Sequence, residues 1–407
     1  MKWSYTPILL ALLVAIACGF LVLRVIHYLE AHALHSAEYY VERANRKRID
    51  GDIDGAIDDY GKAIEINHEM DSAYNNRGLL KEQKGDNAGA LADFNQAIAI
   101  NPRSSIPLVN RAQVEHDTGD FASAIADVDH ALALAPKDPA DAYQIRADAR
   151  RQSGDTDGAI ADYDSIIKLE PATAFNYVYR GNLKMMKQEI DAALGDFNHA
   201  IQLDPQFAVA YGLRGMAEAQ KDDPQAAFAD FNRSIELDPS DSDSYEWRGN
   251  LESNSQKWSD AVADYRKCCE HSPEDPDYPR LFLWIARARL GETEAGSKEL
   301  ADYLQTRGTN AGAGGKKMTP GDWPVKVAGH LLGTVSEEAL LAAANSSDPK
   351  TDGDQHCEAW FYTGEKRLLA GDKAGAIDHF HKCIATGRTD FVEYEMARAE
   401  LKNLGEK

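Results

Sequence analysis

The feature that most constrains this chain is a repeat of about 34 residues. A turn sequence, Gly-Asp or a relative of it, recurs seven times at intervals of 34 or 35 residues. Each turn is followed after five residues by alanine, after nine by a bulky side chain, and after seventeen, in six repeats, by proline. Because glycine takes positive φ freely and proline stops helices, each repeat is predicted to be two helices joined by a tight turn. The turns begin at Gly51, Gly85, Gly119, Gly154, Gln188, Asp222 and Gln256.

This pattern resembles the tetratricopeptide repeat (TPR), and the resemblance covers Ser36 to about Pro273. It implies an all-α fold, a tetratricopeptide α-solenoid that winds as a right-handed superhelix with a concave face for binding partners. A degenerate eighth repeat, with its turn at Gly291, extends the predicted array over residues 36–306. We therefore expect protein or peptide partners in the concave groove.

An arginine lies eight residues before every turn, and an aspartate lies eight residues after it. Equal distances on either side of a turn put both side chains at one height of an antiparallel helix pair, so we predict structural ion pairs. The predicted pairs include Arg77 with Asp93, Arg146 with Asp162, and Arg180 with Asp196. The alternative, a row of arginines that binds phosphate groups, is disfavoured because every arginine has a matched aspartate.

The fifth and sixth repeats carry large apolar side chains at offsets that, by the TPR resemblance, line the concave groove. Other repeats hold mostly polar residues there. An exposed Met, Val and Phe surface with polar surroundings is typical of an adaptable peptide site. The alternative is that local twist buries these side chains between repeats. The predicted partner-binding groove consists of Phe175, Val178, Met185, Met186, Val209 and Met216.

Beyond the array, residues 307–321 are glycine-rich and predict a flexible linker. Residues 322–405 are expected to form a C-terminal helical unit with a final TPR, whose turn begins at Gly371, and a capping helix. The sequences WPVKVAGHLLGTVSEEALLAAA at 323–344 and CEAWFYTGEKRLLAGDKAGAIDHF at 357–380 resemble NlpI-type bacterial envelope lipoproteins. In that family, TPR lipoproteins act as adaptors for peptidoglycan hydrolases and their proteases. The resemblance implies an adaptor in a cell envelope.

Cysteines and histidines gather in the final repeat. Cys357 and Cys383 are expected at similar heights of one helix pair, so a disulfide between them is possible, with two free buried thiols as the alternative. A rival function, a metal- or thiol-dependent activity, would also use this unit. His379 and Cys383 share a helix face, and His356 or Cys357 could complete a zinc site.

The N-terminal segment, residues 1–30, differs from the rest of the chain. Residues 6–23 carry no charge and are just long enough to span a bilayer, which predicts an N-terminal hydrophobic helix that anchors the chain. A cleaved signal peptide ending at Ala15-Ile16-Ala17 and lipidation of Cys18 are the alternatives. With a single-pass anchor, we expect the bulk of the chain in the periplasm, although the flanking charges leave the side open.

The chain is strongly acidic, with 44 Lys+Arg against 66 Asp+Glu and a net charge of −22. This charge disfavours nucleic acid as a partner, because phosphate binding needs clustered basic residues. No sequence motif for catalysis, a cofactor or a metal stands out. We predict a membrane-anchored TPR scaffold or adaptor that mediates protein–protein interactions in a bacterial envelope, without enzyme activity, cofactor or metal.

Overall fold

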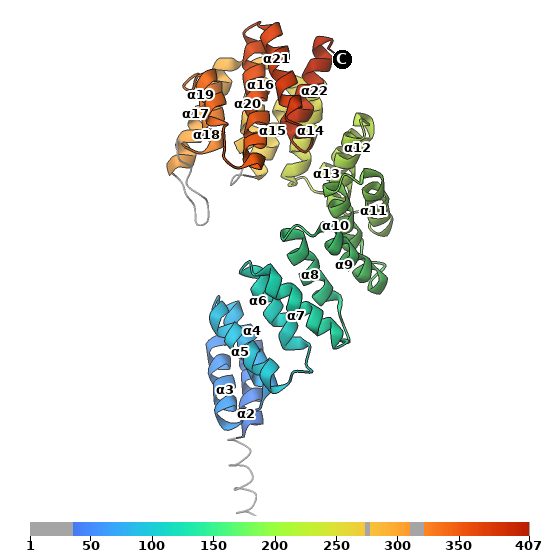
Figure 1. Ribbon diagram of the computed structural model, residues 1–407, viewed down its shortest axis with the longest axis vertical. Coiled ribbons are helices and arrows are strands. Elements are labelled where there is room, and N and C mark those ends of the chain that lie inside the picture. Colours follow the sequence, from blue (N-terminus) through green and yellow to red (C-terminus); the bar gives the residue numbers. More distant parts are fainter. Residues whose placement is uncertain (1–35, 273–276, 310–320, 407) are drawn as a thin grey trace, which may run out of the picture. The chain divides into compact units, whose positions relative to one another are not determined.

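The computed structural model describes residues 36–272, 277–309 and 321–406, and every regular element in these ranges is an α-helix (Figure 1). The prediction of an all-α helical-repeat fold is confirmed. The chain divides into two compact units between Ala172 and Thr173. Each unit is a series of antiparallel helix pairs.

The first unit is built from eight described helices. They are α2 (Ala37–Ile49), α3 (Ile53–Ile66), α4 (Asp71–Gln83), α5 (Asn87–Ile100), α6 (Ile106–Asp117), α7 (Phe121–Ala133), α8 (Ala140–Gln152) and α9 (Thr156–Leu169).

The second unit continues the pairs and ends in a cluster of C-terminal helices. Its repeat helices are α10 (Ala174–Met186), α11 (Ile190–Leu203), α12 (Ala208–Gln220), α13 (Pro224–Leu237), α14 (Ser242–Asn254), α15 (Trp258–His271), α16 (Asp277–Arg289) and α17 (Thr293–Thr309). The C-terminal helices are α18 (Trp323–Leu331), α19 (Glu337–Ala343), α20 (Pro349–Leu369), α21 (Lys373–Ala385) and α22 (Val392–Leu404).

The turn within each pair follows local rules. Gly85 has φ +79°, and the Asp86 side chain after it caps α5 by accepting the Gly89 N–H at 2.9 Å. The first unit has glycine at all four such turns. Three turns of the second unit adopt the same positive φ without glycine, at Gln188 (+61°), Asp222 (+58°) and Gln256 (+58°).

The two helices of a pair meet through small residues and rings. In the fifth repeat, a Cβ on Gly181 of α10 would lie 2.7 Å from Cε1 of Phe197 in α11, so only glycine fits this contact. Phe197 and the alanine at the start of its helix, Ala193, are fully buried. The repeated alanine and aromatic positions therefore form the core of each pair.

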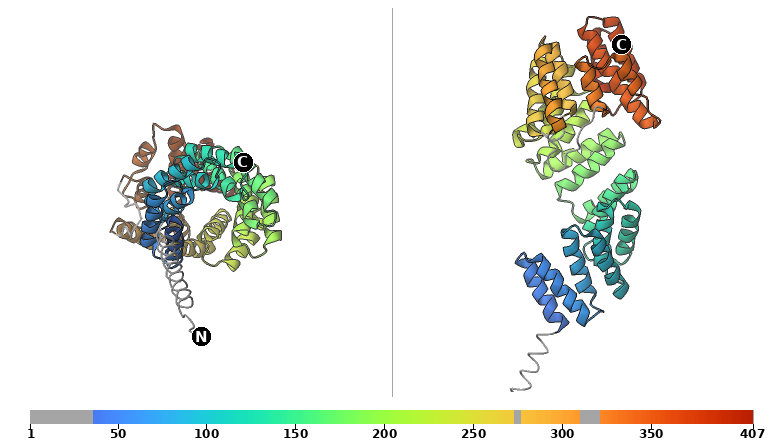
Figure 2. Two further views of the ribbon diagram at one scale, coloured as in Figure 1. Left: turned by 90° about the horizontal axis from the view of Figure 1, so that it is seen from below. Right: turned by 90° about the vertical axis from the view of Figure 1, so that its left-hand side faces the viewer.

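The C-terminal helices do not extend the array as one more isolated pair. Helices α15, α16, α18, α20, α21 and α22 share one hydrophobic core, and α22 also packs on α14 (Figure 2). The Asn403 side chain donates a hydrogen bond to the Asn254 carbonyl at 3.2 Å. Most of the predicted linker, residues 310–320, lies outside the described residues.

The prediction of a membrane-anchored, periplasmic protein is wrong for the described residues. Within the described ranges, no helix has both the length and the apolar character needed to cross a bilayer. The predicted hydrophobic helix, residues 6–23, lies outside the described residues.

Candidate functional site

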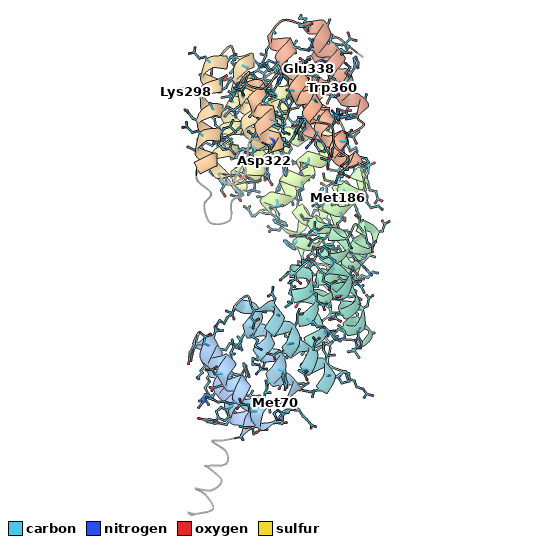
Figure 3. All side chains as sticks on the ribbon, turned by 60° about the vertical axis from the view of Figure 1, so that its left-hand side comes forward. Met70, Met186, Lys298, Asp322, Glu338 and Trp360 are labelled. Carbon is cyan, nitrogen blue, oxygen red and sulfur yellow. The ribbon has the colours of Figure 1, made fainter. Side chains whose placement is uncertain are left out.

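Helix α10 carries the largest share of the predicted groove, and it divides those residues between two stripes. At 3.6 residues per turn, Phe175, Tyr179 and Met186 lie on one face, and Val178 and Met185 lie on a second stripe about 90° away from it. The first stripe is exposed: Phe175 is 43% and Met186 is 56% accessible, and Met186 lies at the end of α10 (Figure 3). Val178 (4%) and Met185 (6%) are buried. These two residues pack the repeat and present no surface to a partner.

Helix α12 repeats part of this arrangement. Val209 holds the position of Phe175 in the next repeat and is 51% accessible, whereas Met216 is half-buried. Helices α10 and α12 pack against each other, and the rings of Phe175 and Tyr179 lie 4.2 Å apart between centroids. We call Phe175, Tyr179, Met186 and Val209 the α10–α12 apolar face. It is narrower than the groove predicted from the sequence.

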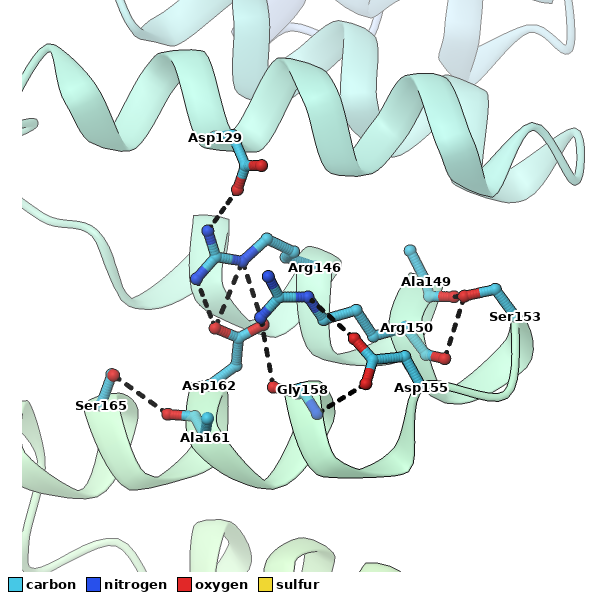
Figure 4. A network of polar contacts seen from close by, with 10 residues as sticks. All are labelled: Asp129, Arg146, Ala149, Arg150, Ser153, Asp155, Gly158, Ala161, Asp162 and Ser165. Carbon is cyan, nitrogen blue, oxygen red and sulfur yellow. Dashed lines mark hydrogen bonds and ion pairs between the residues drawn. The ribbon is translucent and has the colours of Figure 1, made fainter.

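The repeat arginines are engaged in structural contacts. Arg146 of α8 binds Asp162 of α9 at 2.5 Å and also Asp129 of α7 at 2.5 Å, so one guanidinium joins three helices (Figure 4). In the first repeat, the hydrogen bond from Arg43 lowers the pKa of Asp59 to about 2. The pairs are Arg43–Asp59, Arg77–Asp93, Arg111–Asp127, Arg146–Asp162, Arg180–Asp196, Arg214–Asp230 and Arg248–Asp264, at 2.5–2.7 Å.

The residue four positions before each turn modifies this ion pair. Four repeats supply a second cation to the aspartate: Lys47 (3.0 Å), Lys81 (2.8 Å), Arg150 (2.9 Å) and Lys184 (2.7 Å). The third, sixth and seventh repeats place a glutamate there instead, namely Glu115, Glu218 and Glu252. Burial, with added repulsion from the repeat aspartate, raises the pKa of Glu115 to about 7 and that of Glu252 to about 8. In the third and seventh repeats, an acid with a raised pKa therefore stands where four other repeats have a second cation.

The cysteines of the final repeat are two free thiols. Their Sγ atoms lie 3.4 Å apart, and both side chains are fully buried. The hydrogen bond with Cys357 and burial raise the pKa of Cys383, so its thiol stays protonated and is a poor nucleophile. The disulfide between Cys357 and Cys383 remains a prediction.

The residues considered for zinc do not converge. His379 Nδ1 lies 2.8 Å from Thr363 Oγ1, and His381 is exposed. His356 Nδ1 lies 2.8 Å from the Asp352 carbonyl oxygen. Across the described ranges, no cluster of three or more His, Cys, Asp or Glu side chains is placed to hold a metal ion.

Sequence reasoning missed a second feature, a pair of buried glutamates in the C-terminal core. Glu358 of α20 is 4% accessible and Glu393 of α22 is 3% accessible, and both line a cavity. The available signal was glutamate inside two largely apolar runs, CEAWFY with Glu358 and FVEYEM with Glu393 and Glu395. Only the packing of distant helices brings the two carboxylates together.

Comparison with known families identifies the repeats. A model described as "TPR repeat" matches residues 44–85, and one described as "Tetratricopeptide repeat" matches residues 76–139, 109–177 and 180–242. These segments are tetratricopeptide repeats. Arrays of such repeats present extended surfaces to protein or peptide partners. The resemblance of residues 323–405 to NlpI-type lipoproteins lies beyond the matched TPR segments and stays a prediction.

Several solved structures are similar to this chain. YrrB, described as a TPR protein with an unusual peptide-binding site, is 19% identical over 46% of this chain and 95% of its own, with a TM-score of 0.41. A TPR protein from Parabacteroides merdae is 19% identical over 61% of this chain and 98% of its own, with a TM-score of 0.49. Yeast Tom70 is 16% identical over 91% of this chain and 96% of its own, with a TM-score of 0.36.

Proposed function

We propose that this TPR protein is a non-catalytic scaffold or adaptor and that a protein or peptide partner binds on the α10–α12 apolar face. The observation that carries the proposal is the exposure of Phe175, Met186 and Val209, three large apolar side chains on neighbouring repeats. Exposed apolar surface of this kind marks interaction sites on soluble proteins. The NlpI-type resemblance of the C-terminal block favours the same adaptor role.

The other repeats support this choice by contrast. At the position of Phe175 and Val209, four repeats carry polar residues, namely Glu38, Ser72, Asp141 and Asp243. The third repeat has Ile106 there, but both neighbouring repeats are polar at this position. A pair of adjacent repeats with apolar side chains at this position therefore occurs at the fifth and sixth repeats.

The chemistry of the face indicates an apolar segment of the partner. Methionine is flexible and polarizable, so Met186 can adapt to different side chains, and the contacting rings of Phe175 and Tyr179 offer a rigid surface on the same helix face. The buried Val178 and Met185 hold the exposed stripe in place from below. A scaffold that only binds its partner needs no catalytic group or cofactor at this face.

The test begins with a photo-crosslinking amino acid at Met186 in the native host, followed by identification of the crosslinked protein. The affinity of that purified protein is then measured against Met186→Lys and Val209→Lys. Each substitution places a charge in an apolar contact, and we expect each to weaken binding about tenfold or more. Both side chains are about half exposed, so the fold should tolerate the change.

Matched controls are available in the first unit. Ile49 holds the position of Met186 in the first repeat and is 76% accessible, and Ile106 holds that of Val209 and is 62% accessible. Ile49→Lys and Ile106→Lys should leave the affinity unchanged. Equal losses in all four variants, or wild-type binding by Met186→Lys, would refute the proposed face.

A further inference from the structure

A cavity of about 560 Å³ lies among α14, α16, α18, α20 and the start of α22, within the second unit. Its volume is in the range of ligand-binding pockets. Aromatic side chains form much of its wall, and they are Tyr278, Phe282, Trp323 and Phe391. The cavity also reaches the two buried glutamates, Glu358 and Glu393. We call it the acidic cavity.

The two glutamates receive hydrogen bonds from neutral donors. Trp323 Nε1 donates to Glu358 at 2.8 Å and the Tyr278 hydroxyl donates to it at 3.2 Å. The Tyr362 hydroxyl donates to Glu393 at 3.0 Å. Among the residues that the structure describes, neither carboxylate forms an ion pair with a lysine, arginine or histidine.

The same two helices carry a second pair of buried glutamates, and that pair has a cation. Glu365 of α20 and Glu400 of α22 each lie seven residues, or about two turns, after the first pair. Arg289 of α16 binds Glu365 at 2.9 Å and Glu400 at 3.1 Å. Seven residues before Arg289, α16 has Phe282, which lines the acidic cavity. The position that supplies a cation to one pair therefore supplies a ring to the other.

Arg388, just before α22, binds other carboxylates of the cavity wall. Arg388 binds Asp354 at 2.6 Å and Asp390 at 3.1 Å, and its guanidinium lies 5.2 Å from the ring centre of Phe391. Asp354, Asp390 and Phe391 all line the cavity. This wall therefore already holds a guanidinium between carboxylates and a ring. In the described part of the chain, Glu358 and Glu393 have no such cation.

Two buried carboxylates without a cation are costly, and burial raises the pKa of both Glu358 and Glu393. We propose that the acidic cavity binds the cationic side chain of a lysine or arginine from a peptide partner, whose charge takes the place that Arg289 holds in the neighbouring pair. This site is distinct from the α10–α12 apolar face and does not depend on it.

The chemistry of the cavity fits such a side chain in both of its parts. The aliphatic stem of lysine or arginine packs on apolar walls, and its charged end is attracted by aromatic faces and by carboxylates. The net charge of −22 attracts cationic segments over longer distances. A free small amine would gain the ionic contact but leave most of the aromatic wall uncovered.

The test follows the indole N–H signal of Trp323 by NMR in the full chain, with Trp323→Phe to assign it. The probe is the acetylated and amidated peptide Ala-Ala-Lys-Ala-Ala, and its neutral counterpart carries norleucine. We expect a saturable shift with the lysine peptide and binding weaker by about tenfold or more with norleucine. Glu358→Gln and Glu393→Gln keep the side-chain shape. Each should weaken the binding of the lysine peptide to a similar degree.

The control removes one negative charge outside the cavity. Glu395→Gln lies on α22 at a partly exposed position and should bind the lysine peptide as the wild type does. Equal binding of the two peptides, no effect of either cavity variant, or an equal loss in Glu395→Gln would overturn the proposal. Spermidine that binds as tightly as the peptide would also overturn it, by showing a small-amine site. Unchanged thermal unfolding of Glu393→Gln shows that a loss of binding is not a loss of fold.

Discussion

At the residue scale, the repeat arginine is held between the helices it joins. The Arg248 guanidinium binds Asp264 at 2.6 Å and Asn232 of the preceding repeat at 2.5 Å. Asp264 is 5% accessible, so removing its partner would leave a buried, uncompensated charge. Each of the seven repeat arginines binds an aspartate in this way, which favours a structural role over a phosphate-binding row.

The ion pair is best tested in the seventh repeat. In the fourth repeat, Asp162 would keep Arg150 at 2.9 Å if Arg146 were removed, whereas the seventh repeat has the acid Glu252 at the position of Arg150. We expect Arg248→Ala to cost about 3 kcal/mol in unfolding free energy and the double variant with Asp264→Ala to cost less. Chemical denaturation of both single variants and the double variant measures this. Strictly additive losses would show that the two side chains are independent.

Glu252 offers a second test at this scale. Its folded pKa of about 8 exceeds its ordinary value of 4.5, so the folded state holds an extra proton between these values. The contribution of this residue to stability should therefore fall as pH rises from about 4.5 to about 8. Glu252→Lys copies Lys184, which binds Asp196 at 2.7 Å, and should stabilise the protein at pH 8 by about 1–2 kcal/mol.

The control for this change is Glu69→Lys, which alters the net charge equally at an exposed position. It should give little stabilisation and keep the pH slope of the wild type. Unfolding curves at pH 5 and pH 8 measure both effects. A similar gain in the two variants would mean that net charge, and not the ion pair, is responsible.

At the element scale, the turns within helix pairs differ between the two units. Gly119 has φ +84°, and Gln256 holds the equivalent place at +58°. An L-residue in this region costs roughly 1–2 kcal/mol, because its Cβ approaches the following carbonyl oxygen. The helix pair of the seventh repeat forms despite this cost, because Ala261 and Tyr265 in its core are fully buried.

Restoring glycine at such a turn should therefore stabilise the pair. We expect Gln256→Gly to raise the unfolding free energy by about 0.5–1 kcal/mol, since the strain is relieved while the unfolded chain gains some freedom. The reverse change, Gly119→Gln, should cost about 1 kcal/mol. Gln113→Gly, inside α6, serves as the control and should destabilise by about 1 kcal/mol. If thermal unfolding shows that Gln256→Gly is less stable than the wild type, the turn at Gln256 is not strained.

The final repeat offers a covalent test of how α20 and α21 are joined. With Sγ atoms 3.4 Å apart, Cys357 and Cys383 need only a small movement to form a bond of about 2.05 Å. Oxidised glutathione should give this disulfide, and the closed segment should add about 3–4 kcal/mol of stability. Non-reducing peptide mapping identifies it. Oxidised samples in which both thiols remain free would refute the pairing.

At the scale of the whole molecule, the C-terminal helices form the largest common core of the described chain. The sequence predicts a final repeat followed by a capping helix, and that helix, α22, packs on α20 and α21 and also on α14. The ion pairs of Arg289 with Glu365 and Glu400 tie α16 to helices about 76 and 111 residues later. Such contacts bring the walls of the acidic cavity together from helices that are far apart in the sequence.

The sequence by itself determines what lies within one repeat. The 16-residue spacing of Arg146 and Asp162, the turn at Gly154 and the buried alanine at Ala159 all follow from the repeat, because these contacts join residues of one helix pair. Only the tertiary structure decides which apolar residues of α10 are exposed, since Val178 and Phe175 differ by 60° on one helix and identical patterns can face core or solvent. It alone decides that Glu365 meets Arg289, because that contact depends on packing between segments far apart in the chain.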